Sequence, residues 1–226
     1  PLIASESASL QDYRKSGYDR GHLIPAADAT WSAESMSETF YLSNMSPQEP
    51  SFNRGIWADL EAVVRNFADT NAEIYVVTGP IFYPDSPLKT IGENKVAVPD
   101  AYFKVILDYI EPDIKAIGFI LENEGSKESL QNFAQSVDEV ERITQIDFFP
   151  LLENSIEESL ESSYSVDDWD FDTFSVTKEE RREYLSRKED GVEIVEIPVV
   201  QEESPFMTLI LEIMMESKKE LQKLLF

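Results

Sequence analysis

Apolar residues recur at intervals of three and four in the segment 52–70, which is the spacing of one buried helix face. The members of this apolar stripe are Ile56, Leu60, Val63, Val64 and Phe67. Ser51 stands before the segment and is a residue type that caps helix N-termini. Gly55 weakens the first turn without forbidding it. The pattern predicts one continuous helix over 52–70.

Other segments carry the β-branched and aromatic residues of strands, and they are 20–26, 39–44, 72–80, 101–110 and 114–123. The first is short and ends at Pro25, and 72–80 is expected to be a buried strand that ends at a Gly-Pro pair. Only a short Pro-Asp turn separates the last two segments. We therefore predict that 101–110 and 114–123 form an antiparallel hairpin, whereas 46–51, with two prolines, is a loop.

Two helices are expected in the later part of the chain. Ser136 and Glu139 have the spacing of a capping box, and Ser155 and Glu158 repeat that spacing. The order of strand, helix, strands and helices indicates the α+β class, with a central antiparallel sheet flanked by helices.

The composition changes near residue 173, where a charged segment is followed by a period-two segment and an apolar-to-basic segment. We assign 1–173 to a main domain and 174–226 to an appended helix-strand-helix segment. The appendage either packs on the same core or stands apart from it.

The net charge of −25 indicates a strongly solvated surface and excludes a broad cationic platform for nucleic acid. Phosphate chemistry in such a chain has to depend on a local site with a divalent cation. Acidic residues are fewer near the N-terminus, because 1–66 holds nine acidic and five basic side chains. The absence of cysteine excludes disulfides and zinc-thiolate sites. No apolar run reaches the length of about 18 residues that a membrane span needs, so we expect no membrane insertion.

His22 is the sole histidine and follows Asp19-Arg20-Gly21. Imidazole is the side chain whose ordinary pKa suits a general base near neutral pH. Arg20 offers a planar donor fork for phosphate oxygens. A purely structural histidine is the alternative interpretation.

Asn53 and Glu61 are separated by about 80° around the predicted helix, with Trp57 between them, so they share one face. An amide oxygen and a carboxylate suit Mg²⁺ or Ca²⁺ rather than zinc. Asn44 and Gln48, in the neighbouring loop, supply further amides. The alternative for Asn53 is a helix cap.

Three motifs occur in order over about 45 residues, and they read "YDRGHLIPAAD", "TFYLSNMSPQ" and "FNRGIWADLE". In this order they resemble the DNA/RNA non-specific endonuclease family of ββα-metal nucleases. The stretches "GPIF", "VPDAYFKVIL", "GFILEN" and "SVDEVERITQIDFFP" are also similar, so that the resemblance covers roughly 12–173. It implies a ββα-metal fold for the main domain.

The resemblance implies a role for each of five residues. His22 matches the general base that activates water, and Asn53 matches the direct protein ligand of one Mg²⁺, for which Mn²⁺ or Ca²⁺ are substitutes. Glu61 matches the acid that fixes a water on the metal. Arg20 matches a donor to the phosphate, and Asn44 matches an asparagine that supports the site.

The implied reaction is endonucleolytic hydrolysis of DNA and RNA with little sequence specificity, leaving 5′-phosphates. The resemblance also allows an inhibitor protein and a homodimer, and it favours a secreted or periplasmic location. Two alternatives stay open: an inactive or self-inhibited nuclease-fold interaction protein, and a phosphodiesterase for smaller substrates. The high acidity supports the first of these alternatives.

The family places another strand, with an arginine near the phosphate, before the first motif. We expect either that this strand lies upstream of Pro1 or that another segment, such as 174–226, closes the sheet. Arg14 is the residue that could in part replace the arginine of that strand.

Overall fold

The structure is a computed structural model that describes residues 7–71, 73–110 and 114–171. The expected appendage 174–226 lies outside the described residues. Within the described part, no helix is both long enough and apolar enough to cross a bilayer.

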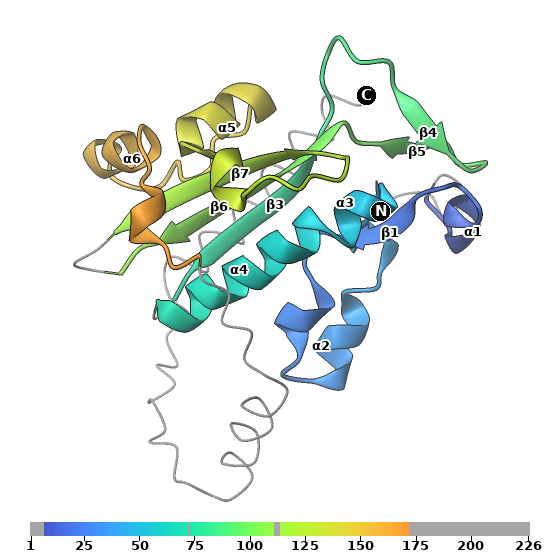
Figure 1. Cartoon of the computed structure of the whole chain (residues 1–226), viewed down its shortest axis with the longest axis horizontal. Coiled ribbons are helices and arrows are strands. Elements are labelled where there is room, and N and C mark those ends of the chain that lie inside the picture. The colour runs from blue at the N-terminus through green and yellow to red at the C-terminus, as the bar shows by residue number, and fades with distance from the viewer. Residues whose placement is uncertain (1–6, 72, 111–113, 172–226) are drawn as a thin grey trace, which may run out of the picture. The chain divides into compact units, whose positions relative to one another are not determined.

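A four-stranded antiparallel sheet forms the centre of the fold, with the strand order β3-β6-β7-β8 (Figure 1). Its strands are β3 (Tyr75–Ile81), β6 (Ala101–Asp108), β7 (Lys115–Glu122) and β8 (Ala134–Gln135). The antiparallel pairing of β6 with β7 confirms the predicted hairpin. β3 is at the edge and pairs with β6 alone among the described strands, so that Val76 and Val77 are 42% and 38% exposed. The prediction that this strand is buried was therefore wrong.

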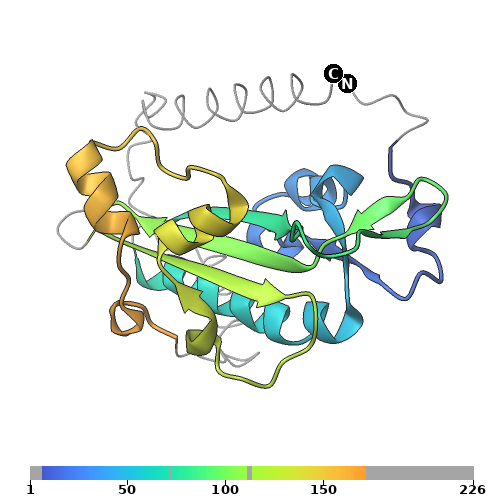
Figure 2. The same cartoon turned by 90° about the horizontal axis from the view of Figure 1, so that it is seen from above.

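Helices cover both faces of the sheet (Figure 2). The long helix α4 (Ile56–Thr70) lies on one face, and α5 (Val137–Thr144) and α6 (Asn154–Glu161) lie on the other. The predicted apolar stripe of α4 is buried against side chains of β6 and β7, among them Tyr102, Ile106, Ile117, Phe119 and Leu121. The other side of β7 receives α5, where a Cβ on Gly118 would come within 2.6 Å of Val140. These contacts confirm the α+β class.

The helix predicted over 52–70 is broken into two. The short α3 (Pro50–Asn53) ends before Gly55, and α4 starts at Ile56. A Cβ at Gly55 would lie 2.4 Å from the carbonyl oxygen of Ser51, so the chain passes too closely there for a side chain. Glu49, rather than Ser51, caps the first turn, because its carboxylate accepts hydrogen bonds from the backbone N–H groups of Ser51 and Phe52.

A separate strand pair precedes these helices. β1 (Asp19–His22) pairs antiparallel with β2 (Met45–Gln48), and His22 lies opposite Met45. The strand expected over 39–44 was wrong, because this segment uses its backbone groups in local turns. The N–H groups of Phe40 and Asn44 donate to the carbonyls of Ser37 and Tyr41.

The strand instead occupies part of the expected loop 46–51, where Pro47 lies opposite Arg20. The order β1, β2, α3–α4 is the two-strand-and-helix unit that the resemblance implies.

Smaller elements complete the fold. They are α1 (Leu10–Tyr13), η2 (Ala26–Ala29), α2 (Ala33–Glu38), η3 (Leu42–Asn44), the hairpin β4 (Lys89–Ile91) and β5 (Val96–Val98), η4 (Leu130–Phe133) and η5 (Val166–Asp168). The predicted cap of α5 is present, since Ser136 Oγ accepts from the Glu139 N–H. The predicted cap of α6 is wrong: the helix begins at Asn154, and Ser155 lies inside its first turn.

Candidate active site on the strand pair and the broken helix

A hydrogen-bonded group joins the start of β1 to the end of α3. Asn53 Nδ2 donates to Asp19 Oδ2 at 3.0 Å, and Arg54 donates to both oxygens of Asp19 at 2.7 and 2.6 Å. Arg54 and Asn53 hold the pKa of Asp19 below its ordinary value, so the carboxylate stays ionised. Because the amide nitrogen of Asn53 is committed to Asp19, its Oδ1 points elsewhere and accepts no hydrogen bond from the described residues. An oxygen presented in this way suits a hard cation.

His22 is half-buried, with its ring at right angles to that of Phe40 and the two ring centres 4.8 Å apart. Its Nε2 is buried and has no hydrogen-bond partner among the described residues. Burial and the positive charge of Arg20 lower the pKa of His22 below its ordinary value. The imidazole is therefore neutral at neutral pH and can accept a proton.

Asn44 stabilises the backbone that follows His22. Its Oδ1 accepts from the Ile24 N–H, and its Nδ2 donates to the carbonyls of Ile24 and Thr39 at 2.9 Å each. Both ends of the amide are thus used by the backbone. This arrangement fits the supporting role that the resemblance implies.

Gln48 does not offer its amide to the site. Its side chain is fully buried beneath β1, where a Cβ on Gly21 would lie 1.9 Å from Gln48 Oε1. Trp57, which the sequence placed between Asn53 and Glu61, is also wholly buried and packs against Phe52 and Tyr102 in the core. Trp57 precedes Leu60 and Val64 at intervals of three and four, so its ring belongs to the buried stripe of α4.

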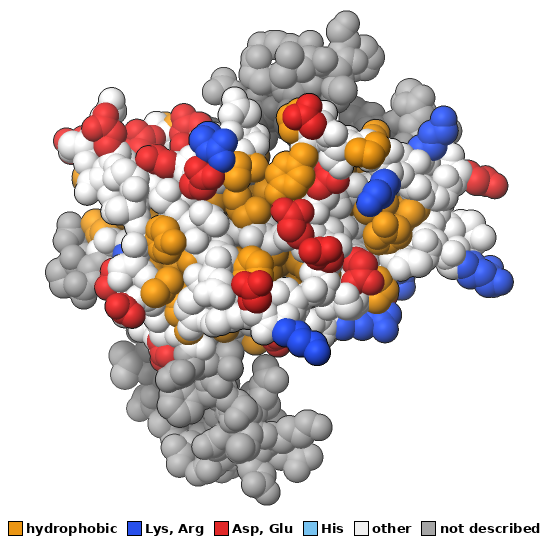
Figure 3. All heavy atoms as spheres, turned by 45° about the horizontal axis from the view of Figure 1, so that its top comes forward, with side chains coloured by type: hydrophobic (Ala, Val, Ile, Leu, Met, Phe, Trp, Pro, Cys, Tyr) orange, Lys and Arg blue, Asp and Glu red, His pale blue; other side chains and the backbone are white. Residues whose placement is uncertain are grey.

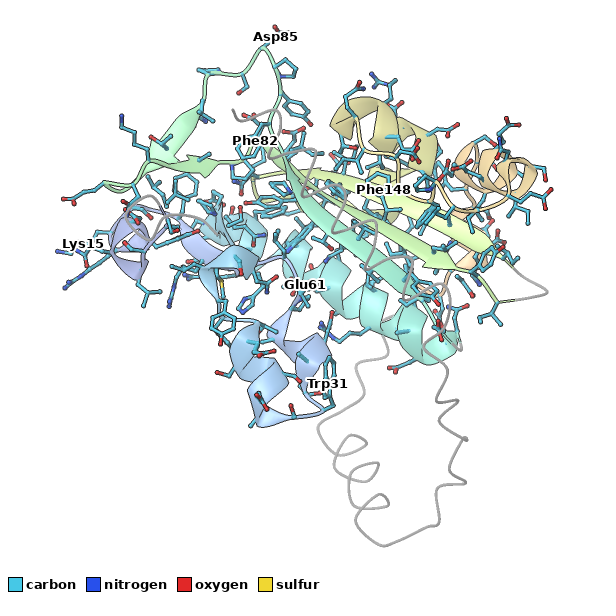
Figure 4. The ribbon with its side chains drawn as sticks, turned by 180° about the vertical axis from the view of Figure 1, so that it is seen from behind. Lys15, Trp31, Glu61, Phe82, Asp85 and Phe148 are labelled. Atoms are coloured by element: carbon cyan, nitrogen blue, oxygen red, sulfur yellow. The ribbon has the colours of Figure 1, made fainter. Side chains whose placement is uncertain are left out.

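Glu61 projects from α4 toward the segment that holds η2 and α2 (Figure 4). Burial raises the pKa of Glu61 to about 7, and the positive charges of Lys104 and Arg65 oppose that rise. Lys104 is on β6 and is 1% exposed, and its Nζ donates to Thr78 Oγ1 at 2.9 Å and lies 4.7 Å from the centre of the Trp57 ring. Burial lowers the pKa of Lys104 to about 8.

Sequence reasoning missed Lys104. Its signal was the one basic residue inside the otherwise apolar stretch "AYFKVIL". A lysine is almost never fully buried unless it is paired with an opposite charge.

A second polar link joins the segment after His22 to α4. Asp28, in η2, forms an ion pair of 3.0 Å with Arg65, which is one helical turn beyond Glu61. In the sequence, His22 thus lies between two residues that bind the helices: Asp19, which contacts Asn53, and Asp28, which contacts Arg65. The two links tie the His22 segment to both parts of the broken helix, although no hydrogen bond joins His22 directly to Asn53 or Glu61 among the described residues.

A hollow of about 590 Å³ opens next to the Asp19–Asn53 pair. The residues that line it are Leu10, Gln11, Tyr13, Arg14, Tyr18, Asp19, Arg20 and Asn53. Arg14 and Arg20 give this hollow two guanidinium groups that can bind phosphate oxygens. His22 and Glu61 are not among its lining residues.

Comparison with known proteins gives a consistent answer. Residues 2–155 match the family described as DNA/RNA non-specific endonuclease. Mitochondrial endonuclease G of Bos taurus is 38% identical over 158 residues, which are 65% of this chain and 53% of that protein. Nuclease C1 of Cunninghamella echinulata var. echinulata is 40% identical over 159 residues, 66% of this chain and 63% of that protein. The chain therefore spans between 53% and 63% of the length of these relatives.

A solved structure also matches. In the crystal structure of an EndoG/EndoGI complex, described as showing the mechanism of EndoG inhibition, one chain aligns with a TM-score of 0.61 and 35% identity. The alignment covers 65% of this chain and 64% of that chain.

Proposed function

Because this chain belongs to the DNA/RNA non-specific endonuclease family, we propose that it cleaves the phosphodiester bonds of DNA and RNA in a metal-dependent reaction with little sequence specificity. The observation that supports this most is the neutral imidazole of His22 on the same strand as Asp19, which accepts a hydrogen bond from Asn53. A site that reads phosphate rather than base edges carries no sequence information, which accounts for the low specificity.

His22 is the general base of the proposed reaction. Its neutral imidazole takes a proton from the water that attacks phosphorus, and the lowered pKa keeps the ring neutral, and so able to accept that proton, at neutral pH. Phe40, in edge contact with the imidazole, restricts the ring. Asn44 fixes the backbone on the C-terminal side of the base through its three hydrogen bonds to Ile24 and Thr39.

Asn53 Oδ1 is the proposed ligand for Mg²⁺, and Mn²⁺ and Ca²⁺ are substitutes. The bound cation supplies charge stabilisation at the phosphate and at the leaving oxygen. Asp19 engages the amide nitrogen of Asn53, so the amide oxygen would be free to bind the cation. Glu61 accepts a hydrogen bond from a water of the hydrated ion, for which its carboxylate has to be ionised, and Lys104 favours that form.

Arg20 and Arg14 are the proposed phosphate-binding groups. Both line the same hollow as Asn53, so a phosphate held there would also be near the cation. Arg14 adds a second guanidinium group beside that of Arg20. The reaction would leave 5′-phosphates.

A nuclease-fold protein that is inactive or self-inhibited is the second candidate. The net charge of −25 favours it, because a polyanionic protein repels nucleic acid at long range. Binding of an inhibitor protein is a further proposal, since the similar solved structure is that of an EndoG/EndoGI complex. A homodimer and a secreted or periplasmic location stay predictions.

Supercoiled plasmid and a folded RNA, each incubated with the chain in Mg²⁺ or in EDTA, provide the test. We expect nicking that needs Mg²⁺ and that falls by about 10²–10⁴-fold in His22→Ala, with an unchanged circular dichroism spectrum. Full activity in the variant would exclude His22 as the base. A folded wild-type chain that cleaves neither substrate would favour the second candidate.

A further inference from the structure

Three carboxylates meet between α5 and α6, on the sheet face opposite α4. Asp138 and Glu141 come from α5, and Glu161 is the last residue of α6. One oxygen from each carboxylate lies within 4.8 Å of the others. Figure 3 shows Asp and Glu side chains gathered over these two helices. We refer to Asp138, Glu141 and Glu161 as the acidic triad.

Glu161 is the unusual member of the acidic triad. It is 5% exposed, and its Oε1 is buried with no hydrogen-bond partner among the described residues. Buried carboxylates are normally paired, because an uncompensated charge inside a protein is strongly unfavourable. Its position at the C-terminal end of α6 makes an ionised carboxylate still less favourable, since that end of the helix dipole carries partial negative charge.

Among the described residues, none supplies a positive charge that acts on Glu161. The side chains whose charges act on it are Glu141, Glu157, Asp147 and Asp138, and with burial, which is the largest cause, they raise the pKa of Glu161 to about 8. Arg142, which is exposed on the same helix as Glu141, donates both of its hydrogen bonds to Glu139. The folded protein thus has an excess of negative charge here, and either a proton or a cation has to balance it.

We propose that the acidic triad is a Ca²⁺ site that joins α5 to α6 and is separate from the cation at Asn53. Calcium accepts carboxylate oxygens at about 2.3–2.6 Å, and three oxygens that all lie within 4.8 Å of one another can reach one such ion. Magnesium requires a smaller, regular octahedron with ligands at about 2.0–2.1 Å. Carboxylates on two helices that meet at an angle suit the irregular coordination of calcium better.

Calcium titration of the full chain in the Asn53→Ala background tests this proposal, because that substitution removes the proposed catalytic cation. We expect isothermal titration calorimetry to show one Ca²⁺ per chain, with a Kd in the range of about 10⁻⁵–10⁻³ M. The melting temperature should rise with the Ca²⁺ concentration, and less with Mg²⁺ at the same concentration.

Two substitutions in the triad and one outside it complete the experiment. Glu161→Gln should weaken Ca²⁺ binding at least about tenfold, because ligand charge sets the affinity, and it should be no less stable than its parent in EDTA. Asp138→Asn changes an exposed member and should have the same effect on binding. Glu158→Gln removes an equal charge from the exposed face of α6, outside the triad, and should leave binding unchanged.

The proposal is overturned if the Asn53→Ala chain shows neither heat nor a higher melting temperature with millimolar Ca²⁺. It is also overturned if Glu161→Gln and Asp138→Asn bind as tightly as their parent. None of these measurements involves cleavage of nucleic acid, so the calcium site and the proposed nuclease activity can fail independently.

Discussion

Asp19 accepts a hydrogen bond from the Asn53 amide nitrogen at 3.0 Å, across a separation of 34 residues in the chain. The contact fixes which atom of the amide is free. Because Asp19 also receives the fork of Arg54, its position is set from two sides.

Removal of the Asp19 carboxylate should therefore act on metal binding. In Asp19→Ala the Asn53 amide can rotate, and we expect the Mg²⁺ concentration for half-maximal activity to rise about 10–100-fold, with most of the activity recovered at saturating Mg²⁺. Arg54→Ala keeps the Asp19–Asn53 contact and should have a smaller effect. An unchanged Mg²⁺ dependence in Asp19→Ala would mean that Asn53 is not the ligand.

The charge of Lys104 should shift the pH profile of the reaction. Lys104 lowers the pKa of Glu61, which burial has raised to about 7. In Lys104→Met this pKa rises further, so Glu61 ionises only at higher pH, and the acid limb of the activity profile should move to higher pH. Thr78→Val removes the hydrogen bond to Lys104 and keeps the charge, so it should leave the limb in place. Equal shifts in both variants would contradict an electrostatic role.

Arg14 should contribute to substrate binding. We expect Arg14→Ala to raise KM with a smaller effect on kcat, and to reduce the slope of log K against log salt by about 1, as for the loss of one phosphate contact. Lys15 is the matched control, because it is the neighbouring cation and does not line the hollow, and Figure 4 shows it at the outer end of the molecule. Similar salt slopes in Arg14→Ala and Lys15→Ala would exclude a specific contact.

Gly55 should be required for the fold of the site. The Cβ of Gly55→Ala would come within 2.4 Å of the Ser51 carbonyl, so α3 or α4 has to move, and we expect a loss of about 1–3 kcal/mol in the free energy of unfolding. Urea denaturation measures this change. Because Asn53 is two residues away, the Mg²⁺ requirement should rise as well, and a variant with wild-type stability would show that the helix can be continuous.

Much of the fold could be predicted from periodicity alone. The β6–β7 hairpin and the apolar stripe of α4 are strong local patterns, and both were confirmed. The strand β2 was missed because Pro47 is typical of loops, while the turns over 39–44 are rich in β-forming residues. The break at Gly55 was missed because it depends on a close approach to Ser51, which no spacing rule describes.

The residue types of the candidate site could be predicted from the sequence, whereas the contacts between its residues could not. His22 and Asn53 were proposed from their residue types and from the family resemblance, but their connection through Asp19 is a contact between distant parts of the chain. Lys104 was missed because Glu61, whose charge acts on it, lies on another element, and a single charged residue in an apolar strand does not reveal which charge faces it. The location of the acidic triad likewise needs the packing of α5 on α6.

Because of the break between α3 and α4, the side chains of Asn53 and Glu61 stand on two different helices. Asn53 is bound to β1 through Asp19, whereas Glu61 lies on α4, whose apolar stripe packs on the main sheet. A hydrated ion shared by both side chains would link α3 to α4. Binding of the ion would then reduce the motion of the segment between α3 and α4, and amide hydrogen exchange around residues 53–56 would slow.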